Sequence, residues 1–539
     1  MIIMNSDSKK PQFIPILCSS KIFLTSLVSF QYYIKIIEEV SLMSDLNKQK
    51  IVDSVPQKGF FGHPKGLFTL FFTEFWERFS YYGMRAILVY YMYYEVSKGG
   101  LGISEGTAIA IVSIYGSLVY MSGIIGGWFA DRIFGTSKAV FYGGIFIMLG
   151  HVVLAVPGSI TMFFISMILI VIGTGLLKPN VSSIVGEMYS SEDARRDAGF
   201  SIFYMGINLG GFLSPIIVGE IGMNYSFHLG FGLAAIGMLC GLIVFMMTKK
   251  KNLGLAGTFV PNPLSKKEKK KVYSSIGISL VIIAIILAIL IPLKILTFES
   301  FVTIVGILGF LIPAIYFIVM YRSPKTTRDE RSRLIAYIPL FLAAVMFWAI
   351  QEQGSTILAA YADKRTQLEF GGFSLSPTIF QSINPLFIII FAPVFAWIWV
   401  KLGNRQPSVS KKFSIALLFA GLSFIIMMLP AYLSGANTLV SPLWLVLSYF
   451  LVVVGELCIS PVGLSATTKL APAAFSAQTM SLWFLSSAAA QALNAQIAPL
   501  FTKISEVAYF GILGGVAIFL SIILFLLSPM IQNKMKGIK

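Results

Sequence analysis

The 539-residue sequence contains few charged residues. Asp, Glu, Lys and Arg together make up 12% of the chain, against about a quarter in soluble proteins, and the mean hydropathy is +0.81. The three cysteines and three histidines are widely spaced, so they indicate neither a disulfide framework nor a metal-ligand cluster. This composition excludes an ordinary soluble enzyme and makes a lipid bilayer the expected environment.

Long apolar runs make up most of the chain. A bilayer core about 30 Å thick requires roughly 20 apolar residues per helix, and runs of that length, bounded by charged residues, Gly or Pro, predict fourteen membrane-spanning helices. The predicted spans are 67–94, 106–130, 139–157, 160–188, 198–221, 227–248, 273–296, 300–321, 335–361, 374–400, 412–433, 440–468, 477–502 and 507–531. We therefore expect an all-α membrane protein.

The basic residues outside these spans are distributed unequally between the two sides. Of the 41 Lys and Arg residues, 29 lie in segments that alternation places on one side and 5 lie on the other. Because Lys and Arg concentrate in cytoplasmic loops, both termini are predicted to be cytoplasmic. The formal net charge of +17 is then mostly a signal of topology, and no nucleic-acid partner is expected.

A basic segment after the sixth predicted span divides the chain into two halves. Two six-helix bundles facing each other are typical of transporters with a central cavity, and two strongly apolar spans between them look like an inserted, lipid-facing pair. The alternative is that this pair belongs to the bundle itself. The predicted segments are a cytoplasmic N-terminal segment (43–66), an N-terminal bundle (67–248), a basic linker (249–272), the inserted pair (273–321), a cytoplasmic linker (322–334), a C-terminal bundle (335–531) and a cytoplasmic tail (532–539).

Residues 1–42 fit this plan poorly. Their apolar run is interrupted by Lys21 and Lys35 and lacks the small-residue cleavage pattern of a signal peptide. We predict a dispensable N-terminal extension, with an additional helix as the alternative.

Four charged residues lie inside the first predicted span: Glu74, Glu77, Arg78 and Arg85. With 100° per residue, they share one helix face about 140° wide with two tyrosines, Tyr81 and Tyr82. A charge inside a membrane span is costly and usually marks a functional site, so this face is predicted to line a cavity. Alternatively the cluster neutralises itself and only sets helix packing, but Arg85 has no acidic neighbour on its own helix.

Three further charges stand alone in apolar spans: Lys178, Glu352 and Glu456. Since a buried ion without a partner is strongly destabilising, the cations of the first half are predicted to pair with the acids of the second. Such pairs can break and re-form as the halves rock. Burial and a nearby cation act in opposite directions on the proton affinity of a carboxylate, so they can also couple transport to protons. Gly-Lys-Ser/Thr occurs nowhere, which disfavours ATP-driven transport.

Long motifs surround these charges. They are Glu74–Phe79 (Glu-Phe-Trp-Glu-Arg-Phe), Tyr81–Arg85, Gly126–Gly135, Lys178–Asn180 and Phe200–Gly210. In these motifs the chain resembles the proton-dependent oligopeptide transporter family, which has the major facilitator fold. The resemblance extends from about Lys65 to the C-terminus. The resemblance implies a proton-coupled symporter that imports di- and tripeptides across a bacterial plasma membrane by alternating access. We expect a monomer in the lipid bilayer that needs no cofactor besides the proton.

The resemblance also implies roles for individual residues. The peptide carboxylate would be held by Arg78, Arg85 and Lys178, and the peptide amino group by Glu456 with Asn384. Hydrogen bonds and side-chain pockets would come from Tyr81, Tyr82, Tyr120, Asn208, Trp348, Trp483 and Ser487. Proton coupling would involve Glu74, Glu77 and Glu352, with two gate salt bridges, an outer one between Arg85 and Glu352 and an inner one between Lys178 and Glu456.

Other functions are less well supported by the residues. The nearest alternative is a carrier of the same fold for another small anion such as nitrate, an amino-acid derivative or a drug-like compound. Nitrate carriers of the family tend to lose the first-helix acids, and both Glu74 and Glu77 are present here. An intramembrane enzyme would need a nucleophile, a base or a metal cluster, whereas His63, His151 and His228 are scattered. Paired charges would block the continuous pore of a channel.

Overall fold

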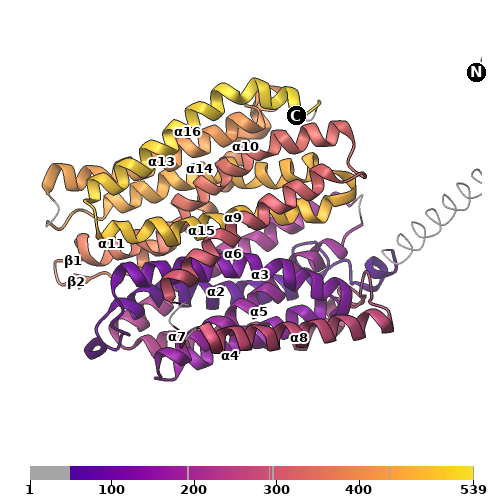
Figure 1. Ribbon diagram of the computed structural model, residues 1–539, viewed down its shortest axis with the longest axis horizontal. Coiled ribbons are helices and arrows are strands. Elements are labelled where there is room, and N and C mark those ends of the chain that lie inside the picture. Colours follow the sequence, from indigo (N-terminus) through magenta and orange to yellow (C-terminus); the bar gives the residue numbers. More distant parts are fainter. Residues whose placement is uncertain (1–48, 191–192, 291, 294–296, 436–437, 538–539) are drawn as a thin grey trace, which may run out of the picture.

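Long helices make up nearly the whole protein. The computed structural model describes residues 49–190, 193–290, 292–293, 297–435 and 438–537, so the predicted extension at 1–42 lies outside the described residues. The helices run roughly along the long axis of the molecule, with the first half of the chain below the second in Figure 1.

The described helices follow the order predicted from the apolar runs. The first half contains α2 (Gly66–Tyr93), α3 (Glu105–Phe129), α4 (Thr136–Ala155), α5 (Ile160–Glu187), α6 (Arg196–Asn224) and α7 (Phe227–Asn252). They are followed by α8 (Lys266–Leu290) and α9 (Phe298–Arg322). The second half contains α10 (Arg328–Gln351), α11 (Ile357–Arg365), α12 (Ile383–Leu402), α13 (Val409–Ser434), α14 (Leu443–Leu470), α15 (Ser476–Ile497) and α16 (Glu506–Lys534).

Short elements connect these helices. They are η1 (Val96–Lys98), the π-helical η2 (Ala130–Phe134), η3 (Glu352–Ser355), η4 (Pro377–Ser382), η5 (Gly403–Arg405), η6 (Ala473–Phe475) and η7 (Ala498–Thr502). The strands β1 (Glu369–Phe370) and β2 (Phe373–Ser374) form an antiparallel hairpin. The predicted continuous span 335–361 is interrupted at η3, because the α-helix ends at Gln351 and the chain tightens into a 3₁₀ turn.

Twelve helical elements within the described residues are long and apolar enough to cross a membrane. Helix α2, which carries four charged side chains, and α15, in which Ser, Ala and Gln are frequent, are also long but less apolar. The all-α membrane protein is therefore confirmed, whereas the count of fourteen spans, the orientation of the termini and the segment boundaries stay predictions.

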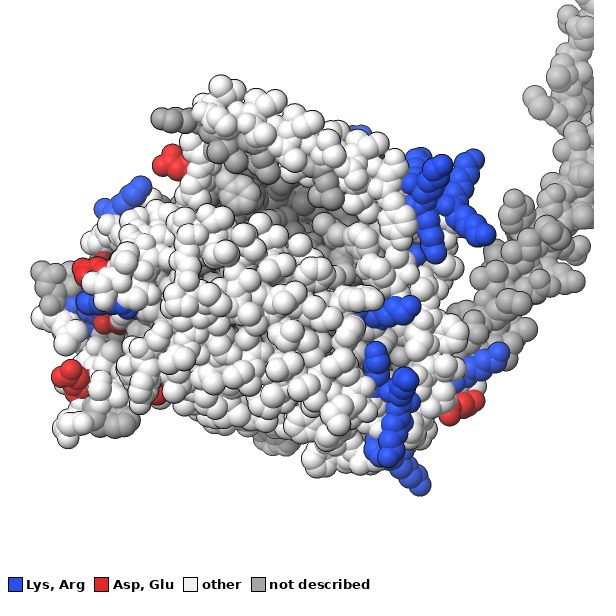
Figure 2. Space-filling model, turned by 90° about the horizontal axis from the view of Figure 1, so that it is seen from below, with Lys and Arg blue, Asp and Glu red and all other residues white. Residues whose placement is uncertain are grey.

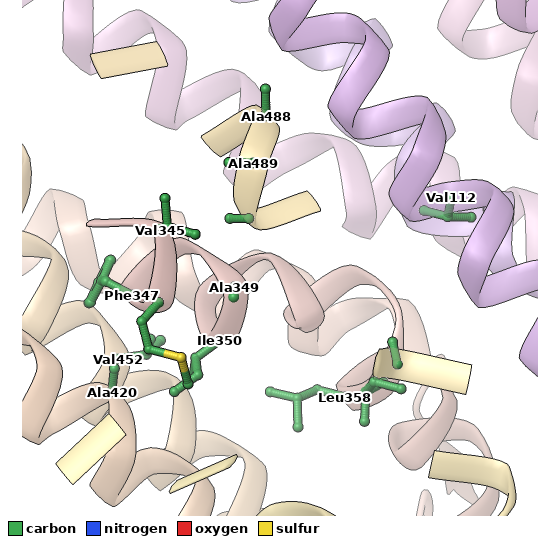
Figure 3. Close-up of a cluster of buried hydrophobic side chains, with 14 of the residues drawn as sticks. Val112, Val345, Phe347, Ala349, Ile350, Leu358, Ala420, Val452, Ala488 and Ala489 are labelled. Atoms are coloured by element: carbon green, nitrogen blue, oxygen red, sulfur yellow. The ribbon is translucent and has the colours of Figure 1, made fainter. Parts of the chain in front are cut away.

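The two halves share an apolar core. Helix α3 packs against α15, and α6 packs against α12. Figure 3 shows Val112 of α3 facing the side of α15 that carries Ala488 and Ala489, with Val345 and Phe347 of α10 beyond it. The small alanine side chains allow close contact between α3 and α15, and this helix pair is one of the contacts that join the two halves.

The two helices between the halves have different surroundings. The apolar side chains of α8, such as Val281 and Ile283, are about half exposed, as expected for a helix that faces lipid. Helix α9 packs against α15 and α3, and its Val302 and Val305 are buried. The expectation of a lipid-facing pair therefore fits α8 and only one side of α9.

Glycines set the distance between α3 and α5. A Cβ atom on Gly126 would overlap the carbonyl oxygen of Gly175, and one on Gly175 would meet Ser122 at 2.5 Å from its hydroxyl oxygen. The neighbouring Gly127 has no atom within 4 Å of such a Cβ. Gly126 is thus required for helix contact, whereas Gly127 faces open space.

We predict that Gly126→Ala destabilises the protein and that Gly127→Ala does not. Overpacking of a close helix contact costs about 1–3 kcal/mol, and an added methyl group at Gly126 meets backbone that cannot move aside. The midpoint of thermal unfolding of the detergent-purified protein measures the effect. Equal midpoints for the two variants would contradict this account of the α3–α5 contact.

Candidate functional site

A cavity of about 300 Å³ lies between the two halves. Its walls come from α2, α3, α5 and α6 on one side and from α10, α12, α14 and α15 on the other. The predicted site residues that line it are Glu74, Arg78, Tyr82, Arg85, Tyr120, Lys178, Asn208, Trp348, Glu352, Asn384, Glu456, Trp483 and Ser487. The structure thus brings together residues from eight helices, while Glu77 and Tyr81 lie buried on α2.

A compact charge cluster on α2 forms one wall. The guanidinium of Arg78 contacts both Glu74, at 3.1 Å between Nε and Oε1, and Glu77. It also lies over the rings of Tyr81 and Tyr82, 5.1 and 5.8 Å from their centroids. Two acids therefore neutralise one cation, and Oε2 of Glu74 is buried with no hydrogen-bond partner among the described residues.

An ion pair joins the two halves at the cavity wall next to η3. Arg85 of α2 contacts Oε2 of Glu352, the first residue of η3. Glu352 also accepts hydrogen bonds from the hydroxyl of Tyr120 (2.9 Å) and from Nε2 of Gln491 (2.8 Å). Arg85, which has no acidic neighbour on its own helix, pairs with an acid of the other half, and the carboxylate is held by three donors from α2, α3 and α15.

Lys178 and Glu456 face the same cavity without a counterion. The ammonium of Lys178 lies 4.6 Å from the centroid of the Tyr120 ring, and Glu456 accepts a hydrogen bond from Nδ2 of Asn384 (3.2 Å). Within the described part of the chain, no carboxylate lies within 4.0 Å of Lys178 and no cationic side chain within 4.0 Å of Glu456. The predicted inner pair is not formed in this structure, because the open cavity separates its two members.

Aromatic side chains cover part of the wall beside Glu456. The rings of Trp348 and Trp483 meet edge to face, with centroids 6.3 Å apart. A Cβ atom on Gly463 of α14 would overlap the indole of Trp483, so the glycine makes room for this ring. Broad apolar surfaces of this kind accept side chains of different shapes.

Several polar residues around Glu352 were not predicted from the sequence. Gln491 donates to Glu352 directly. Behind it, Gln353 donates to Oδ1 of Asn494 (3.0 Å) and accepts from the hydroxyl of Tyr509 (2.8 Å). The segment 490–494 of α15 contains two amide side chains, Gln491 and Asn494, so uncharged polar residues inside a predicted span are a signal that indicates them.

One end of the molecule is closed by polar contacts between the halves. The hydroxyls of Tyr93 and Tyr94 on α2 and the residue after it donate to Asp363 of α11 at 2.6 and 2.8 Å. Lys364 pairs with Glu105 at 2.5 Å. Together with the pair of Arg85 and Glu352, these contacts link α2 and α3 to the segment around α11, at the left-hand end of Figure 1.

Comparison with known proteins identifies the family. A model of the POT family matches residues 137–519. The chain belongs to this family. It is 66% identical over 496 residues to the transporter YclF of Bacillus subtilis and 46% identical over 504 residues to a di-/tripeptide transporter of Lactococcus lactis subsp. cremoris, each match covering 92% of this chain and the whole relative.

Solved structures agree with the assignment. The peptide transporter POT whose crystal structure contains sulfate is 71% identical in sequence, with a TM-score of 0.89. The match covers 91% of this chain and 99% of that transporter. The structure of a POT family transporter in complex with 5-aminolevulinic acid is 48% identical in sequence, with a TM-score of 0.86. The match covers 89% of this chain and 99% of that transporter. The resemblance stated from the motifs is therefore confirmed, and the chain is a multi-pass protein of the bacterial plasma membrane.

Removal of the Asp363 carboxylate tests whether the polar contacts hold the α11 end closed. We expect Asp363→Ala to increase the population with separated halves, because both tyrosine hydroxyls lose their shared acceptor. Spin labels at the exposed Val96 and Phe370, in a background without the native cysteines, report the distance between the halves at this end.

The matched control is Glu95→Ala. Glu95 lies in the same region but accepts a hydrogen bond from Ser97 in its own turn. In Glu95→Ala, the distribution of distances between the two spin labels is expected to equal that of the parent. An unchanged distribution in Asp363→Ala would contradict a role of these contacts in closure.

Proposed function

We propose that the protein is a proton-coupled symporter that imports di- and tripeptides by alternating access. The observation that carries this proposal is the pair of unneutralised opposite charges, Lys178 and Glu456, on facing walls of one cavity. A zwitterionic peptide supplies a carboxylate for one and an ammonium for the other. Relatives named di-/tripeptide transporters support the same substrate class.

The rest of the cavity suits the middle of a short peptide. Arg78 and Arg85 add positive potential on the side of Lys178, and Asn384 orients the carboxylate of Glu456. Asn208, Tyr82 and Ser487 offer hydrogen bonds to a peptide backbone, and the two tryptophans face its side chains. Fixed end charges select peptide length, while aromatic walls leave the sequence largely free.

Proton coupling is assigned to Glu352, with Glu74 and Glu77 as further acids. Protonation of Glu352 removes its charge and thereby weakens the attraction to Arg85, which holds the α11 end closed. Opening at that end admits the peptide, and loss of the proton on the opposite side restores the pair. Lys178 and Glu456 then attract each other once the peptide has left, which closes the opposite end.

We further propose fourteen spanning helices with both termini in the cytoplasm, counting α2 and α15 because both have the length of a span and pack within the bundle. The end opposite α11 gathers most of the Lys and Arg visible in Figure 2, which favours the cytoplasmic assignment for that end. The proposed protein acts as a monomer in the lipid bilayer, without a cofactor and without enzymatic activity.

A second candidate substrate is an amino-acid derivative. A neighbouring POT structure holds 5-aminolevulinic acid, which has an amino group and a carboxylate like a dipeptide. The charges of Lys178 and Glu456 suit both compounds, so uptake competition decides between them.

Uptake of labelled dialanine into proteoliposomes tests the proposal. We expect accumulation under an inward pH gradient, loss of accumulation when a protonophore collapses the gradient, and stronger competition by dialanine than by 5-aminolevulinic acid or nitrate. Dialanine transport that is unaffected by the gradient would rule out proton coupling.

Glu352→Gln separates proton coupling from peptide binding. The amide cannot titrate, so gradient-driven uptake should fall to background while counterflow exchange of dialanine stays within about threefold of the parent. Glu369→Gln, in the exposed hairpin, serves as the control and should retain both activities. Equal loss of uptake and exchange in Glu352→Gln would contradict the assigned role.

A further inference from the structure

A second cavity, of about 790 Å³, lies at the end of the second half away from α11. It is enclosed by the last turns of α12, α14 and α16 and by the start of α13. Lining residues include Trp399, Gln406, Ser408, Lys412, Ser465 and Gln532. None of these residues lines the cavity between the halves, so this site is separate from the proposed transport site.

Lys412 is a buried cation in this cavity. Only 8% of the residue is exposed. Its ammonium donates to Oε1 of Gln406 at 2.7 Å and lies 4.2 Å from the centroid of the Trp399 ring. Both partners are neutral, whereas a buried ammonium is normally balanced by an anion because its desolvation is costly.

The surrounding helices supply no anion. From residue 376 to the C-terminus the sequence contains two acids, Glu456 and Glu506. Glu456 lies at the cavity between the halves, and Glu506 pairs with Arg365 (2.8 Å) at the opposite end of α16. Helix α10 also packs against α13, α14 and α16; of the two acids in its first turn, Asp329 is exposed and Glu330 forms a capping box with Thr327. Among the described residues, no carboxylate lies within 4.0 Å of Lys412.

Two further kinds of hydrogen-bond donor face this region. The N-cap residue of α13, Ser408, makes no side-chain hydrogen bond to a backbone amide of the first turn, and its hydroxyl contacts those of Ser410 and Ser528 instead. The first amides of a helix lack intrahelical acceptors and bind anions well. The indole N–H of Trp399 is buried without an acceptor among the described residues.

We propose that this cavity binds a phosphate group, carried by the headgroup of an anionic phospholipid or by a free phosphate. A phosphate oxygen would neutralise Lys412 and accept from the first turn of α13. The bound group would tie α13 to α14 and α16, and α14 carries Glu456. The site is independent of the proposed transport function.

Thermal unfolding of the full-length, detergent-purified protein tests the proposal. We expect the unfolding midpoint of the parent to rise by several degrees with phosphatidylglycerol, and not with phosphatidylcholine, because a ligand that binds only the folded state stabilises it. Inorganic phosphate, with sodium chloride at equal ionic strength as its control, forms the second arm. A rise with phosphatidylglycerol alone identifies a lipid headgroup, and a rise with phosphate as well identifies a site open to free phosphate.

Lys412→Gln should lose at least nine-tenths of this rise, and Lys412→Arg should retain part of it. The matched control is Lys411→Gln, because Lys411 is exposed, one residue away, and lies over the Phe525 ring. This control should respond as the parent does. A single cooperative unfolding transition without added ligand verifies that each variant is folded. No rise in the parent with either ligand, or an equal rise in Lys412→Gln, would overturn the proposal.

Discussion

The ion pair between Arg85 and Glu352 is the interaction on which the arrangement of the two halves depends. Each residue alone would place an uncompensated charge inside the protein, at a cost of about 3–5 kcal/mol when its partner is removed. Because the arginine belongs to α2 and the glutamate to η3, the cost is avoided only when the halves meet at this end. Tyr120 and Gln491 complete the environment of the carboxylate.

The same electrostatic constraint gives the cavity its chemical character. Lys178 and Glu456 stand on facing walls, and the closed contact at Arg85 leaves the space between them open. Lys178 rests against an aromatic ring and Glu456 against an amide, both weaker partners than an opposite charge. A molecule with a positive and a negative end satisfies both residues together, which neither could achieve within its own half.

Much of the fold and of this site could be predicted from the sequence. Charges in apolar spans are so costly that their positions alone indicated the cavity, and Arg85, without an acidic neighbour on its own helix, indicated a partner in the other half. The motifs supplied the family. Hydropathy also placed the helices in the correct order, because each apolar run had the length of a span.

Other features depend on three-dimensional contacts that no local pattern encodes. Helix α10 ends at Gln351, and the 3₁₀ turn η3 follows it in a short polar stretch, residues 351–356, which an average of hydropathy over a whole span does not resolve. Gln491 was missed because an uncharged amide carries little signal in such a run. The separation of Lys178 from Glu456 reflects which end of the molecule is closed, and the sequence is the same in either state.

The most direct test of the central claim, that opposite charges on facing walls hold the two ends of one peptide, is a binding cycle by isothermal titration calorimetry. Dialanine and N-acetyl-dialanine, which lacks the ammonium, are titrated against the parent and against Glu456→Gln. A hydrogen-bonded charge contact is worth about 1.5–3 kcal/mol, so acetylation should weaken binding to the parent roughly ten- to a hundredfold. It should change binding to Glu456→Gln less than about threefold. An equal loss in both proteins would contradict the account.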